Sequence, residues 1–133
     1  MDDLEALRAE IPGYAGYSDA EARHLVDKQL RAWVGERLAA LEGRLGLSSG
    51  PLASAYEHLI SECEFSDPHV MRELEERKFD DSDQALIYRL DRRLMETADR
   101  APTIDAQAAA EYLSELEHLF SSRSALILEE AAS

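Results

Sequence analysis

Two glutamate–histidine pairs have the spacing in this sequence that is most suggestive of chemistry. Glu21 precedes His24 by three residues, and Glu115 precedes His118 by the same interval. In some helical bundles, two such Glu-x-x-His motifs and one glutamate from each of two further helices bind a pair of metal ions. The spacing therefore gives one alternative function for this chain, a metal-binding helical bundle of the di-iron kind.

The direction of these four side chains argues against a buried metal centre. At about 100° per residue, Glu21 falls nearly opposite the apolar stripe of its predicted helix, and His24 falls well away from that stripe. On the last predicted helix, His118 lies on the far side from the apolar stripe and Glu115 lies at its edge. Ligands of a bundle centre project inward, so we expect these residues on solvent faces or in helix caps. We predict no cofactor.

No other motif in the sequence indicates an enzyme. Cys63 is the only cysteine. It lies on an apolar stripe, with His58 about 140° away around the helix, so we predict a buried structural thiol and not a nucleophile. The sequence has no glycine-rich phosphate loop, no Gly-x-Ser-x-Gly motif and no zinc-type cysteine spacing. These features predict a non-enzymatic protein.

The charge of the chain limits its partners. Acidic residues number 28 and basic residues 14, which gives a net charge of -14. Such a field repels phosphate backbones and anionic lipids, so we expect no nucleic-acid binding and favour a basic protein partner. The longest apolar run is residues 125–128, far too short for membrane insertion. The acidic N-terminus lacks a secretory pattern.

The cysteine and lysine content indicates a cellular setting. A single cysteine excludes an intramolecular disulfide and is compatible with a reducing compartment. Alanine and arginine are abundant, whereas the only lysines are Lys28 and Lys78. We therefore expect a cytoplasmic protein of bacterial type.

Apolar residues recur with helical spacing along the whole chain, and no segment shows a convincing two-residue period. We predict one helical domain over residues 1–133. Residues 1–17 form a short helix over 3–10 and a tyrosine–glycine loop, and residues 18–133 form the bundle. Ser18 and Glu21 fit a capping box for the next helix, and Pro51 fits the first position of the one after. The fold class is all-α, an antiparallel bundle of about four main helices with one or two short extra helices.

Two segments are candidates for contacts with a partner. Tyr14 and Tyr17 bracket small residues in a turn, and tyrosine is enriched at binding hot spots; the alternative is that both rings cover one end of the bundle. Leu126 and Ile127 lie in the apolar run near the C-terminus. This run either packs into the bundle or forms a homodimer interface.

Together these patterns predict a non-enzymatic interaction, adaptor or regulatory protein that binds a protein partner or a second copy of itself. Docking is expected at the tyrosine loop, at an acidic face or at the C-terminal helix. A third possibility is a small-ligand pocket lined by aromatic residues on the predicted core faces, although ordinary packing is the stronger expectation for them. These residues are Trp33, Tyr56, Tyr112 and Phe120.

Overall fold

A computed structural model describes residues 1–128, which form six α-helices and no strand. The α-helices are α1 (Asp3–Glu10), α2 (Arg23–Leu45), α3 (Ala53–Glu64), α4 (Pro68–Glu76), α5 (Asp81–Asp99) and α6 (Ala109–Leu128). Short 3₁₀ turns lie at Ala20–Ala22, Leu47–Ser49 and Ala101–Thr103. The predicted all-α fold class is confirmed.

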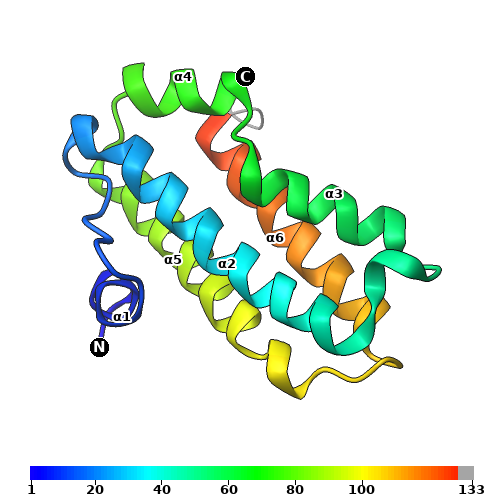
Figure 1. The fold of residues 1–133 in the computed structure, drawn as a ribbon. Helices are drawn as coiled ribbons and strands as arrows, with labels where there is room; N and C mark the ends of the chain where they lie inside the picture. The colour runs from blue at the N-terminus through cyan, green and yellow to red at the C-terminus, as the bar shows by residue number, and fades with distance from the viewer. Residues whose placement is uncertain (129–133) are drawn as a thin grey trace.

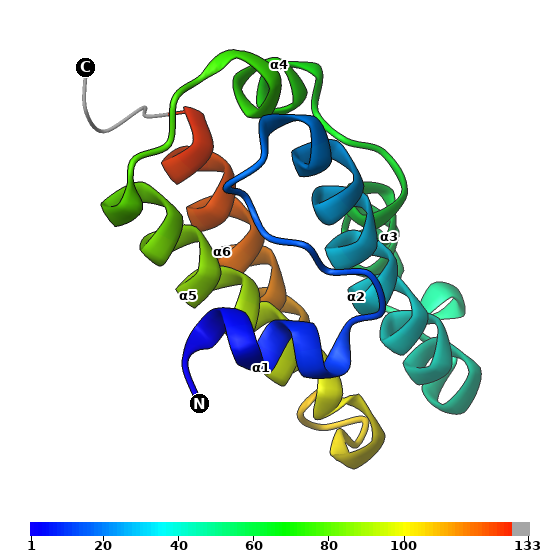
Figure 2. The same cartoon turned by 90° about the vertical axis from the view of Figure 1, so that its left-hand side faces the viewer.

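Four helices form the body of the bundle. Figure 1 shows α2, α3, α5 and α6 running along a common direction, with α2 packed on α3 and α5, and α6 packed on α3 and α5. The short helix α4 covers one end, where it contacts α2 and α6. Helix α1 crosses α5 on the outside of the bundle (Figure 2). This is the predicted bundle of four main helices with two short extra ones.

Two predicted helix starts are corrected by the structure. The predicted capping box of Ser18 and Glu21 does not form, because Asp19 accepts the N–H of Glu21 at 3.0 Å and caps a 3₁₀ turn instead. Helix α2 consequently begins at Arg23. Pro51 does not begin α3, since residues 51 and 52 form a turn that leads into Ala53.

Apolar stripes of the four main helices meet in one core. Leu30, Leu94 and Leu116 are each fully buried, and burying a side chain of this size stabilises the fold by about 1.5–3 kcal/mol. A Cβ at Gly35 would lie 3.3 Å from the Cβ of Cys63. The glycine therefore lets α2 and α3 approach closely, as a small residue at a helix contact is expected to do.

The loop between α1 and α2 crosses one face of the bundle (Figure 2). Gly16 has φ +95°, a left-handed conformation that other residues rarely adopt. The next residue, Tyr17, donates its backbone N–H to the Tyr88 hydroxyl at 2.7 Å. A Cβ at Gly16 would lie only 2.7 Å from that same hydroxyl. Glycine is therefore required here both for its backbone angle and for the space beside Tyr88.

Gly16→Ala is expected to lower the free energy of unfolding by roughly 1–3 kcal/mol, because the residue is strained and the added methyl group collides with Tyr88. The matched control is Gly43→Ala in the exposed interior of α2, where a Cβ meets nothing within 4 Å. That change should stabilise the fold by roughly 0.5–1 kcal/mol. Urea unfolding measures both values. Equal effects of the two substitutions would contradict the packing of this loop.

Candidate functional site

A charged cluster lies in the middle of the bundle, centred on Arg123 of α6. The Arg123 side chain is 1% exposed. Its Nε donates to Asp91 Oδ1 of α5 and its Nη1 donates to Asp27 Oδ1 of α2, each at 2.7 Å. Its Nη2 donates to the Tyr17 hydroxyl at 2.7 Å. One buried side chain therefore joins three elements of the bundle, α2, α5 and the loop after α1.

The carboxylate of Asp91 is fully enclosed and receives three hydrogen bonds. Besides Arg123, the hydroxyls of Tyr14 and Tyr17 donate to its Oδ2 at 2.7 and 2.5 Å. The two tyrosine rings meet edge to face, with centroids 6.2 Å apart. The loop is thus tied to the centre of the molecule through both of its tyrosines.

The carboxylate of Asp27 is bonded in the same way on the other side of Arg123. Arg31 donates its Nε to Asp27 Oδ2 at 2.9 Å, and Ser66 donates its hydroxyl to the same oxygen at 3.0 Å. Arg31 also donates to the backbone carbonyl of Glu62. We call the set the Arg123 cluster; it comprises Tyr14, Tyr17, Asp27, Arg31, Ser66, Asp91 and Arg123. Its two carboxylates balance its two guanidinium groups.

The pKa values in the Arg123 cluster favour fixed charges. Burial alone raises the pKa of Asp27, but Arg123 and Arg31 more than offset this and hold the pKa below its usual range. Burial lowers the pKa of Arg123, yet Asp91, Tyr17 and Asp27 raise it well above the ordinary value. Burial raises the pKa values of Tyr14 and Tyr17, with Asp91 adding to the rise. Near neutral pH, Asp27 is therefore ionised, whereas Arg123 and the two tyrosines keep their protons. Groups that do not change protonation state suit a structural role better than proton transfer.

The burial of Tyr14 and Tyr17 corrects the prediction that they form an exposed contact surface. Tyr14 is 3% exposed and Tyr17 is 0% exposed. Their rings face inward because their hydroxyls satisfy the Asp91 carboxylate, which would otherwise be costly to bury. The alternative stated from sequence, that the rings cover part of the bundle, agrees with this position.

Sequence reasoning missed Asp27, Asp91 and Arg123 as a group. A signal was nevertheless present on α2, where Asp27 and Arg31 are four residues apart and lie beside Val26 and Leu30 of the apolar stripe. An acidic and a basic residue at this spacing on a buried helix face indicate a buried ion pair. Their third partner, Arg123, is 96 residues from Asp27 along the chain, and no local pattern reveals it.

The two glutamate–histidine pairs predicted as metal candidates are not brought together. His24 Nε2 lies 2.8 Å from Glu75 Oε1, while Glu21 is exposed. Glu115 pairs with Arg100 at 3.2 Å, and His118 is exposed on α6. Among residues 1–128, no three side chains of metal-ligating type are grouped so as to hold an ion.

The apolar run near the C-terminus packs partly into the bundle. Ile127 is fully buried, whereas Leu126 is half-buried against the core. Arg77, after α4, donates to the backbone carbonyls of Leu126 and Ile127 at 2.9 and 2.7 Å. Ile127 is therefore a core residue of the single chain, and the homodimer contact predicted for this run stays a prediction.

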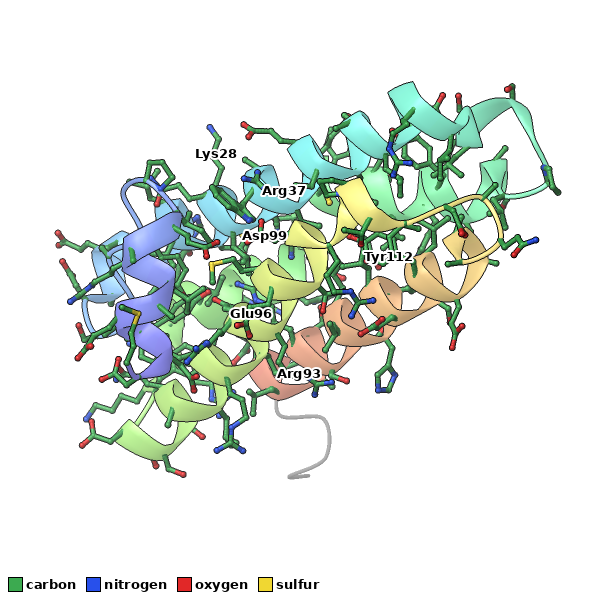
Figure 3. All side chains as sticks on the ribbon, turned by 90° about the horizontal axis from the view of Figure 1, so that it is seen from below. Lys28, Arg37, Arg93, Glu96, Asp99 and Tyr112 are labelled. Carbon is green, nitrogen blue, oxygen red and sulfur yellow. The ribbon has the colours of Figure 1, made fainter. Side chains whose placement is uncertain are left out.

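The aromatic residues proposed for a ligand pocket do not line one cavity. Tyr56 and Tyr112 are buried in the core, and the Tyr112 hydroxyl donates to the carbonyls of Thr97 and Ala98. Tyr112 appears in Figure 3 between α5 and α6. Trp33 and Phe120 line separate surface hollows. Packing accounts for Tyr56 and Tyr112, whereas Trp33 and Phe120 each border a hollow that is open to solvent.

One of these hollows touches the Arg123 cluster. It lies where α3 and α6 meet the start of α4, and it encloses about 310 Å³. We call it the α3–α6 groove, lined by Arg31, His58, Ser61, Glu62, Phe65, Ser66, Asp67, Phe120 and Ser124. Phe65 follows the last residue of α3, and its side chain is 69% exposed. Arg31 and Ser66, two outer members of the cluster, form part of the groove wall.

The charge of the α3–α6 groove is largely negative. Glu62 Oε1 lies 3.3 Å from His58 Nε2, whereas Glu62 Oε2 is buried without a hydrogen-bond partner. Burial raises the pKa of Glu62, as expected for a carboxylate that lacks full compensation. Glu117 approaches the same His58 nitrogen at 3.4 Å. The positive charge of Arg31 is already paired with Asp27. The carboxylates that line the groove, Glu62 and Asp67, are therefore not neutralised by Arg31, and an added cation would be attracted to them.

Arg123→Met is expected to lower the free energy of unfolding by roughly 3–5 kcal/mol, because it leaves two buried carboxylates without their shared cation. The matched control is Arg100→Met, which removes a guanidinium that is 52% exposed and paired with Glu115 on the surface. An exposed pair contributes at most about 1 kcal/mol. Urea unfolding followed by circular dichroism gives both values. If both arginines cost the same, the Arg123 cluster does not stabilise the fold.

The lowered pKa of Asp27 predicts a specific pH dependence. The unfolded carboxyl has a pKa of about 3.9, so the stabilisation by the ionised Asp27 is complete above that pH. It is lost as pH falls below about 3.9 and through the lower folded value. The difference in unfolding free energy between the native chain and Asp27→Asn should therefore be constant from about pH 6 to pH 5 and shrink as pH falls below about 4. A difference that stays constant over this range in urea titrations would show that folding does not lower the pKa of Asp27, and a difference that grows as pH falls would show that folding raises it.

Comparisons with known proteins supply no relative from which a role can be transferred. No protein-family model, curated protein or solved structure matches the chain significantly. None of the helices within residues 1–128 has the length and apolar character needed to cross a membrane.

Proposed function

We propose that this chain is a non-enzymatic interaction protein that binds a basic, apolar segment of a partner protein in the α3–α6 groove. The observation that carries the proposal is the buried, unpartnered Glu62 oxygen in a groove beside the exposed Phe65 ring. A polar atom buried without a partner is costly. The Glu62 side chain as a whole is 30% exposed, so a rotation of its carboxylate would let a cationic side chain of the partner satisfy this oxygen.

Apolar contact would come from two phenylalanines. Phe65 is 69% exposed, a large apolar surface to leave in water. Phe120 is almost fully buried and contributes a wall of the groove. Aromatic faces also attract cations, so a lysine or arginine beside an aliphatic residue fits this lining.

Charge complementarity supports a basic partner. Glu62 and Asp67 line the groove, and Glu117 lies at its edge through its contact with His58. The whole chain carries a net charge of -14, which accelerates the encounter with a positive partner and repels acidic ones. These features favour a peptide-like segment over a nucleic acid or an anionic metabolite.

A non-enzymatic role is favoured because the strongest candidates for proton transfer are already committed. The Arg123 cluster satisfies its carboxylates and hydroxyls internally. Burial raises the pKa of Cys63 to about 12, which keeps this thiol protonated and unreactive at neutral pH. The arrangement suits recognition better than turnover.

The test uses the full chain and a synthetic amphipathic peptide of alternating arginine and leucine, titrated by calorimetry. Glu62→Gln should weaken binding about tenfold, in line with the loss of one charged hydrogen bond. The control Glu57→Gln makes the same charge change at an exposed position of the same helix, and it should leave the affinity within about twofold. Phe65→Ala should also weaken binding, whereas Leu86→Ala on α5 should not.

The paired variants separate groove binding from general attraction between a basic peptide and an acidic protein. Because Leu86 is another exposed apolar residue outside the groove, it controls for nonspecific hydrophobic contact. Equal losses for Glu62→Gln and Glu57→Gln, or equal losses for the two apolar variants, would overturn the proposed function. Binding of a glutamate–leucine peptide with the same affinity would do so as well.

A further inference from the structure

A second hollow lies on a different face of α2 and is built differently. It is lined by Ile11, Pro12, Gln29, Ala32, Trp33 and Glu36, and it encloses about 240 Å³. We call it the Trp33 hollow. Gln29 and Trp33 are each two residues from Arg31 along α2, which places them about 160° around the helix from the α3–α6 groove. The two surfaces are therefore separate.

Two residues that line the Trp33 hollow each have a polar atom without a partner. Gln29 Oε1, an acceptor, and Trp33 Nε1, a donor, are both buried without a hydrogen bond. The two residues are four apart on α2, so their side chains are neighbours on one face of the helix. Each unsatisfied group destabilises the free protein. An unpaired acceptor beside an unpaired donor is complementary to a group that carries both an N–H and a carbonyl.

The other lining residues of the hollow are mostly apolar, and the Trp33 ring is fixed by its neighbours. Ile11 is buried, and Pro12 is a rigid residue at the rim. The guanidinium of Arg37 stacks 3.2 Å from the centre of the Trp33 ring and pairs with Asp99 of α5 at 2.9 Å. Figure 3 shows Arg37 and Asp99 side by side between α2 and α5, with Lys28 extending into solvent. The indole is thus oriented before any ligand binds, which lowers the entropic cost of binding.

We propose that the Trp33 hollow binds one residue of a peptide segment through its amide group. The amide N–H would donate to Gln29 Oε1, and an amide carbonyl would accept from Trp33 Nε1. The apolar side chain of that residue would contact Ile11 and Pro12. Gln29 Oε1 and Trp33 Nε1 are closed to solvent in the free protein, so the ligand reaches them only when a lining side chain moves. Glu36 at the rim is 75% exposed, and its side chain has room to do so.

This inference is independent of the proposed function, since it uses other residues and another face of α2. In the proposed function the α3–α6 groove recognises positive charge, whereas the Trp33 hollow would recognise the peptide backbone. The apolar lining selects for an uncharged side chain, whereas the α3–α6 groove selects for a cationic one. The two surfaces thus fit different parts of a partner.

The test probes the hollow with N-acetyl-leucine N′-methylamide. Trp33 is the only tryptophan in the chain, so its indole N–H resonance and its fluorescence report this one site. Titration of the full chain should shift the indole resonance saturably, with half-saturation on the order of 1 mM for a ligand of this size. The analogue methylated on both amide nitrogens keeps the apolar body but has no N–H donor, and it should bind at least tenfold more weakly.

A pair of matched variants completes the test. Gln29→Leu removes the acceptor and should weaken binding of the amide about tenfold, whereas Gln107→Leu makes the same change at an exposed position outside the hollow and should have no effect. An unmoved indole resonance, as expected if only an ordered water occupies the hollow, would overturn the inference. Equal binding of the methylated analogue, or of the Gln29→Leu variant, would do the same. Peptide binding at the α3–α6 groove is unaffected by either outcome.

Discussion

The burial of Arg123 constrains the whole fold. Removing a guanidinium from water costs several kcal/mol, and the cost is offset only where the surrounding structure supplies well-placed acceptors. Here Asp27 of α2, Asp91 of α5 and the Tyr17 hydroxyl provide them at 2.7 Å. Each acceptor comes from a different segment, so Arg123 is satisfied only when the segments are in register with one another. This dependence favours one packing of the bundle over its alternatives.

The same constraint extends to the surface. Arg31 must face inward to pair with Asp27, and this direction also brings it to the carbonyl of Glu62 at the α3–α6 groove. Ser66 bonds the same carboxylate from the start of the segment that leads into α4. The groove wall is therefore fixed by the cluster beneath it. Its rim differs, because Phe65 is 69% exposed and the Glu117 side chain is 44% exposed.

Local patterns in the sequence were sufficient for the architecture, because helical periodicity and turn residues act over short distances. They predicted the helix over residues 3–10 and the bundle of four main helices, and both agree with the structure. They left Tyr14 and Tyr17 open between a contact surface and a cover over one end of the bundle, since the Asp91 carboxylate that draws the hydroxyls inward is more than 70 residues away. The α3–α6 groove was also missed. Its residues come from three separate stretches of chain, and only packing brings them together.

Helix α2 has a central place in this arrangement because it contributes to both surface hollows and to the Arg123 cluster. Asp27 and Arg31 fix its rotation, which leaves Gln29 and Trp33 pointing away from the α3–α6 groove. Because α2 is one continuous helix, it holds the two hollows at a constant separation. A single extended segment would have to pass around the bundle to fill both hollows. Two separate segments fit more simply, and linked sites of this kind gain affinity from effective concentration when both segments belong to one partner.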